Sequence, residues 1–110
     1  MKRIFIYSSH ALLARGIEVL LRQGANLEIV GTETDLDCAM ERITTLQPDL
    51  VIIDAGDSDP GRALLVTRIL KGLGPCVVGL NLQDNSICIY HGECRIVREV
   101  ADFIRAIESE

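Results

Sequence analysis

Ser8, Ser9, His10 and Asp54 are the residues whose types could do chemistry together. The first three follow one short apolar run, and Asp54 closes another. Parallel strands bring their carboxyl ends to one edge of a sheet, where α/β proteins place their sites. Serine, histidine and aspartate are the residue types of a hydrolytic triad, but the sequence has no nucleophile elbow and no evident oxyanion loop. Capping of a helix by Ser8 or Ser9 is the simpler interpretation of the serines.

A second candidate is the C-x2-H-x2-C spacing of Cys88, His91 and Cys94, which could contact zinc. A fourth ligand is not evident, and none of the four cysteines forms a C-x-x-C pair. Cys76 and Cys88 lie inside apolar runs, where cysteine usually behaves as a small buried hydrophobe. We therefore expect reduced thiols, Cys38 included, and no cofactor.

Length and charge exclude several classes of protein. A chain of 110 residues, 48% of them hydrophobic, can bury one core, so a single domain over residues 1–110 is expected. The formal net charge of −5 offers no basic footprint for nucleic acid. No apolar run approaches the ~20 residues of a membrane span, and the run after Lys2 and Arg3 is too short for a signal peptide. These observations indicate a cytoplasmic domain that binds neither nucleic acid nor membranes.

Strands and helices alternate along the chain and would position these residues. Apolar runs typical of buried parallel strands occupy residues 3–7, 27–31, 49–54 and 76–82. Between them, apolar residues at helical spacing predict three helices, with faces formed by Leu12, Leu13, Ile17, Leu20 and Leu21, by Leu36, Ala39, Met40, Ile43 and Leu46, and by Leu64, Leu65, Ile69 and Leu70. Gly24 is expected to end the first helix, and Asp35 or Asp37 to begin the second. This βαβαβαβ order predicts a parallel sheet with helices on both faces.

The pattern changes after Leu82. Only residues 83–86 separate the fourth strand from the apolar run 87–90, too few for a parallel crossover, so these two strands must be antiparallel. A second turn at 91–93 and a short strand at 94–97 follow. The chain closes with an amphipathic helix carrying Val97 or Val100, Phe103, Ile104 and Ile107.

This order resembles the receiver domain of two-component response regulators, over about residues 3–82 and again in the last helix. Ser8-Ser9-His10 lies where that family usually has two acids, often followed by histidine. The segment from Pro48 to Asp54 looks like the strand that ends in the phosphate-accepting aspartate. The resemblance implies a flavodoxin-like (CheY-like) α/β sandwich with strand order 2-1-3-4-5, its fourth helix replaced by an antiparallel β-hairpin at the edge.

The resemblance fails at the residues that carry receiver chemistry. The family binds Mg²⁺ through the acids after the first strand, and those positions match Ser8 and Ser9. The hydroxyl residue that ends the fourth strand matches Asn81, and no lysine follows Lys71 to neutralise a phosphoryl group. Of the functional set only Asp54 remains, and an acid near helix N-termini is stabilised by their dipoles without any chemistry.

These departures favour a stand-alone pseudo-receiver, a phosphorylation-independent signalling module that binds a protein partner and is not an enzyme. The alternative is an atypical working receiver that is phosphorylated on Asp54 with Mg²⁺, in which Asp57 or Asp59 replaces a lost metal ligand. Loss of the fourth helix would leave an apolar face and an edge strand open. We therefore expect a two-fold homodimer whose interface includes Leu80, Leu82, Ile87, Cys88, Ile89 and Tyr90.

Overall fold

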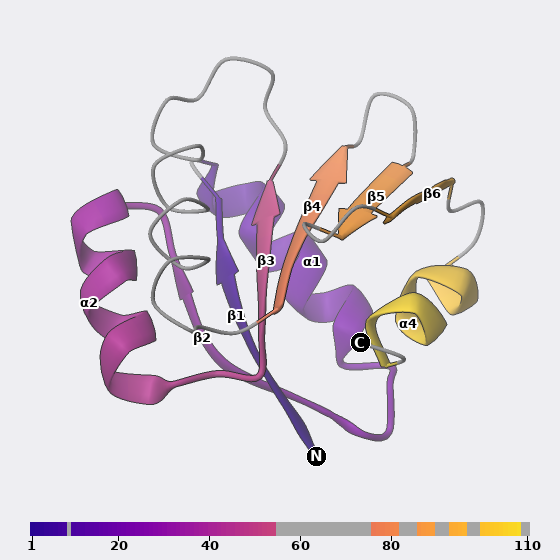
Figure 1. Cartoon of the computed structure of the whole chain (residues 1–110), viewed down its shortest axis with the longest axis horizontal. Helices are drawn as coiled ribbons and strands as arrows, with labels where there is room; N and C mark the ends of the chain where they lie inside the picture. The colour runs from indigo at the N-terminus through magenta and orange to yellow at the C-terminus, as the bar shows by residue number, and fades with distance from the viewer. Residues whose placement is uncertain (9, 55–75, 82–85, 90–92, 97–99, 109–110) are drawn as a thin grey trace.

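The computed structural model describes residues 1–8, 10–54, 76–81, 86–89, 93–96 and 100–108, and the predicted third helix lies outside them. The described elements follow one another as β1 (Lys2–Tyr7), α1 (Ala11–Leu21), β2 (Leu27–Glu33), α2 (Leu36–Leu46), β3 (Leu50–Asp54), β4 (Cys76–Asn81), β5 (Ser86–Ile89), β6 (Glu93–Ile96) and α4 (Val100–Glu108) (Figure 1). None of the helices in these ranges is long and apolar enough to cross a membrane.

The strands form one sheet in the order β2-β1-β3-β4-β5-β6. The first four are parallel, as the apolar runs and their spacing predict. β5 pairs antiparallel with β4, and β6 antiparallel with β5. Only residues 82–85 join β4 to β5, which is too short for a crossover, so the chain must turn back beside β4. The predicted strand order and the antiparallel edge are both confirmed.

Two apolar clusters hold helices against the two faces of the sheet. On one face the helices are α1 and α4, whose buried residues Ala14, Ile17, Leu21, Phe103, Ala106 and Ile107 pack on alternate residues of β1, β3 and β4. On the other face α2 supplies Ala39 and Ile43, which pack on Phe5, Tyr7, Val51, Ile53 and Val77. Successive residues of each central strand thus serve opposite clusters, which explains why these strands are apolar throughout.

The apolar face predicted for α1 is partly wrong. Its buried residues are Ala14, Ile17 and Leu21, whereas Leu12 is 87% exposed. Spacings of three and four residues place those three on one side of the helix, and Leu12 lies on the other.

The predicted role of Gly24 also needs correction. α1 ends at Leu21, and Arg22 is its C-cap in a right-handed conformation, so no left-handed glycine terminates the helix. A Cβ on Gly24 would instead lie 2.7 Å from Leu27 Cδ1 and 3.0 Å from Ile104 Cγ2. The absent side chain therefore lets the end of α1 approach β2 and α4 closely.

Basic residues at the amino edge of the sheet hold the carboxyl ends of two helices. Lys2 Nζ donates to the carbonyl oxygens of Ile107 and Glu108, both at 3.0 Å, at the end of α4. Arg3 Nη1 donates to the carbonyl oxygen of Leu46 at 2.8 Å, at the end of α2. Cations at these positions satisfy carbonyl groups that lack helical partners and complement the helix dipole.

Candidate functional site

The carboxyl ends of the parallel strands meet at one edge of the sheet, where Figure 1 shows the arrowheads of β1, β3 and β4 side by side. Tyr7, the last residue of β1, is paired with Ile53, and Asp54 is paired with Leu80. This register places the backbone of Ser8, Asp54 and Asn81 at that edge. Ser9 lies outside the described residues.

Ser8 is fully buried at the end of β1. Its backbone N–H donates to the carbonyl oxygen of Glu33 at 3.1 Å, continuing the contact between β1 and β2. Its hydroxyl oxygen accepts from the backbone N–H of His10 at 3.1 Å and lies 3.2 Å from the carbonyl oxygen of His10, to which it donates. The side chain is thus a neutral group engaged with the backbone that leads into α1.

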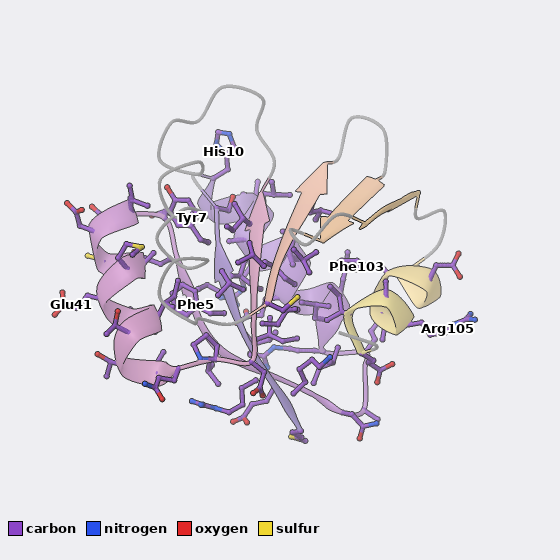
Figure 2. The ribbon with its side chains drawn as sticks, viewed as in Figure 1. Phe5, Tyr7, His10, Glu41, Phe103 and Arg105 are labelled. Atoms are coloured by element: carbon purple, nitrogen blue, oxygen red, sulfur yellow. The ribbon has the colours of Figure 1, made fainter. Side chains whose placement is uncertain are left out.

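The predicted capping of α1 by Ser8 or Ser9 is wrong. The N-cap is His10, an extended residue whose side chain makes no capping hydrogen bond. The helix begins after it because the first helical bond runs from Ala14 N to the carbonyl oxygen of His10, at 3.0 Å. Ser8 acts two residues earlier, bonding the backbone of His10 and not that of the helix. The imidazole of His10 is exposed, and Figure 2 shows it beyond Tyr7 at the carboxyl edge.

Glu33 is a carboxylate at this edge that sequence reasoning missed. It ends β2 and is paired with Tyr7. Its Oε1 accepts from the backbone N–H groups of Thr34 and Asp35 at 3.2 and 3.4 Å, and its Oε2 lies 3.4 Å from Arg42 Nη1. Its position after an apolar run was the sequence feature that could have pointed to it. These contacts show that its side chain stabilises the turn between β2 and α2.

Asp35 is the N-cap of α2 and is one of the two residues that the sequence predicted for this role. Its Oδ1 accepts from the backbone N–H of Cys38 at 3.1 Å. The same carboxylate raises the pKa of the Cys38 thiol, with smaller contributions from Glu33 and Glu41, because a thiolate there would face negative charges. Cys38 is exposed, so solvent screens this effect.

The position that follows β1 offers no carboxylate oxygen to Mg²⁺. This hard cation prefers carboxylate oxygens in octahedral geometry, and β1 ends here in the buried neutral hydroxyl of Ser8. In the described ranges no group of three or more histidine, cysteine, aspartate or glutamate residues could hold a metal ion. Asp57 and Asp59 lie outside these ranges, as does His91 of the suggested zinc spacing.

The residues predicted for a dimer interface divide between the two faces of the sheet. Leu80 is only 7% exposed and belongs to the cluster that includes Phe103 and Ile107, so it is buried within the single chain. Register partners lie on one face, so Ile87 and Ile89 share the α4 face with Leu80 and Val78. Cys88 falls on the opposite face. Leu82 and Tyr90 lie outside the described residues.

No family model matches the sequence, and neither does any curated protein. Solved structures with similar folds include receiver domains. One is the isolated receiver domain of RcsB from Salmonella enterica serovar Typhimurium in the presence of phosphomimetic BeF3⁻ (TM-score 0.64, 18% identity), covering 76% of this chain and 64% of that one. Another is the signal receiver domain of the putative response regulator NarL from Mycobacterium tuberculosis (TM-score 0.60, 23% identity). This match covers 73% of this chain and 64% of that one.

A third similar structure matches almost the whole chain. It is the signal receiver domain of a modulated diguanylate cyclase from Desulfovibrio desulfuricans G20, described as an example of alternate folding (TM-score 0.62, 16% identity). It covers 98% of this chain and 75% of that one, so the match extends through β5, β6 and α4. These similarities show that the chain has the receiver fold. The match spans 64% of the length of each of the first two neighbours.

Proposed function

We propose that this chain is a pseudo-receiver, a signalling module that acts by binding a protein partner and needs no phosphorylation. The observation that carries the proposal is Ser8. At the end of β1, where the receiver fold presents acids to a metal, it is fully buried and bonded to His10.

Charge explains why this position matters. Phosphoryl transfer depends on positioning and on stabilisation of negative charge, which a divalent cation normally supplies. A hydroxyl in the protein interior adds no charge to attract that cation. Asp54 would then remain as an acid at a strand end without the electrostatic partners of the reaction.

The surface of α1 supports a role in protein binding. Leu12 and Val19 are 87% and 55% exposed, and nothing lies within 4 Å of a Cβ built on Gly16 between them. Spacings of four and three residues put all three on one side of the helix. An apolar stripe with a glycine at its centre would let a partner approach the helix backbone closely.

The test is incubation of the protein with Mg²⁺ and acetyl phosphate, followed by intact mass measurement. The proposal predicts no phosphoryl adduct. An adduct that disappears in Asp54→Asn would establish the alternative, an atypical working receiver. A receiver domain that accepts phosphate under the same conditions is the positive control.

The edge strand leads us to extend the proposal to a homodimer. Within the described sheet β6 pairs with β5 alone, so its outer backbone groups could pair with a second copy around a two-fold axis. Sedimentation of the wild type as a monomer at tens of micromolar would refute this extension.

A further inference from the structure

The two cysteines of the antiparallel edge are direct register partners. Cys88 on β5 is paired with Cys94 on β6, between the pairs Ile87–Arg95 and Ile89–Glu93. Opposite residues of an antiparallel pair have Cα atoms roughly 4.5–5.5 Å apart. A disulfide spans roughly 4.4–6.8 Å between Cα atoms, so this register satisfies its distance requirement.

The same register places both cysteines on the α2 face of the sheet. Cys88 is paired with Gly79, and Gly79 with Ile53, which is buried against α2. Paired residues lie on one face, so Ile53, Gly79, Cys88 and Cys94 form a row across four strands. Gly79, the neighbour of Cys88 in this row, contributes no side chain.

We propose that Cys88 and Cys94 are a redox pair that forms a reversible disulfide between β5 and β6. The oxidant is a low-molecular-weight disulfide such as glutathione disulfide. One cysteine thiolate attacks a glutathione sulfur and releases one glutathione thiolate, leaving a mixed disulfide on the protein. The second thiolate attacks the protein sulfur of that bond and releases the other glutathione. Two protein thiols are oxidised, one glutathione disulfide is reduced, and the two thiol protons end on the two glutathiones.

The bond is reversible by the same chemistry. Thiolate attack by reduced glutathione reverses both exchange steps. The loop it closes is short, so it removes little entropy from the unfolded chain. Formation of the bond would add a covalent link to the backbone pairing of β6 with β5, and reduction would leave the backbone pairing alone, which makes the stability of the edge strand responsive to thiol redox state.

The other two cysteines provide internal controls. Cys38 is exposed on α2, and Cys76 is half-buried on β4, where its register partner is Leu50. Neither faces a cysteine across a strand pair in the described sheet. Either thiol can form a mixed disulfide with glutathione, but the proposed internal bond does not need them.

The experiment equilibrates the full chain with glutathione buffers of increasing oxidised fraction, after treatment with a chelator. Trapped thiols are then mapped by mass spectrometry without reduction. The expected product is a linked Cys88–Cys94 peptide, formed equally in the double variant Cys38→Ser, Cys76→Ser and reversed by reduced glutathione. Cys88→Ser and Cys94→Ser should each retain a glutathione adduct on the remaining cysteine. Separate adducts on both cysteines of the wild type, or a bond to Cys38 or Cys76, would overturn the proposal.

A parallel experiment with zinc distinguishes the redox pair from a metal site formed by the same cysteines. The oxidation is repeated with one equivalent of Zn²⁺. An unchanged yield of the linked peptide supports the redox pair. Protection by Zn²⁺ that is lost in His91→Ala would overturn it in favour of a metal site. Neither outcome depends on whether Asp54 is phosphorylated.

Discussion

The two ends of β1 use polar groups in different ways. At the amino edge, Lys2 and Arg3 make charged hydrogen bonds to the ends of α4 and α2, and Asp49 Oδ2 accepts from the backbone N–H of Arg3 at 2.9 Å. At the carboxyl edge, β1 ends in a buried neutral hydroxyl. The strong electrostatic contacts of β1 therefore stabilise the fold at the edge away from the predicted site. A neutral hydroxyl supplies no charge to attract a divalent cation, and this contrast supports the binding role proposed above.

The largest expected effect comes from restoring a charge at the carboxyl edge. Ser8→Asp would bury a carboxylate in place of the hydroxyl and should destabilise the protein by roughly 3–5 kcal/mol. Ser8→Ala is the control and should cost about 1 kcal/mol, since it removes the bonds to His10 without adding a charge. Urea unfolding measures both. Equal stability of the two variants would mean that this edge accommodates a carboxylate.

Removing the charges of the amino edge should have an intermediate effect. Lys2→Met and Arg3→Met keep much of each apolar stem but leave helix-terminal carbonyl oxygens without their charged donors. Each should lower the free energy of unfolding by about 1–2 kcal/mol.

Arg22→Met is the matched control for these two variants. Its guanidinium, on a side chain that is 68% exposed, pairs with Glu18 one turn earlier in α1, so its loss should cost less than about 0.5 kcal/mol. Thermal or urea unfolding of the three variants compares them directly. If all three lose equally little, the bonds of Lys2 and Arg3 do not hold the helices.

The smallest expected effect concerns Asp35, beside the carboxyl edge. Asp35→Asn keeps a capping oxygen and should change stability by a few tenths of a kcal/mol, whereas Asp35→Ala should cost about 1 kcal/mol. Both remove the charge that raises the pKa of the Cys38 thiol, so more thiolate forms at a given pH.

Alkylation of Cys38 with iodoacetamide at mildly alkaline pH should therefore be faster in Asp35→Asn than in the wild type. Glu41→Gln, which removes a weaker influence on the same thiol, should accelerate it less. An unchanged rate in Asp35→Asn would show that solvent screens the carboxylate completely.

The sequence predicts what depends on local pattern. The apolar run from Ile4 to Tyr7 indicates a buried strand, and the short link after β4 requires an antiparallel neighbour. Parallel strands then bring Ser8, Asp54 and Asn81 to one edge. The side of α1 that faces the sheet was harder to predict, because Leu12 and Leu13 are both apolar and only packing decides between them.

Contacts between distant residues were beyond local pattern. Lys2 reaches carbonyl groups more than a hundred residues away, as its sequence separations of 105 and 106 show. The bond from Ser8 to His10 depends on where α1 begins. Capping preference alone predicted a serine as the N-cap, whereas the N-cap is His10. The opposition of Cys88 and Cys94 depends on the register of β5 and β6, which a C-x2-H-x2-C spacing does not reveal.

Calorimetric titration with Mg²⁺ tests the central claim most directly. The wild type and Asp54→Asn are titrated side by side, since the variant removes the remaining acid of the receiver set. A neutral, buried Ser8 predicts that neither protein binds Mg²⁺ saturably below millimolar concentration. Saturable binding to the wild type that disappears in Asp54→Asn would contradict the account and identify a working receiver.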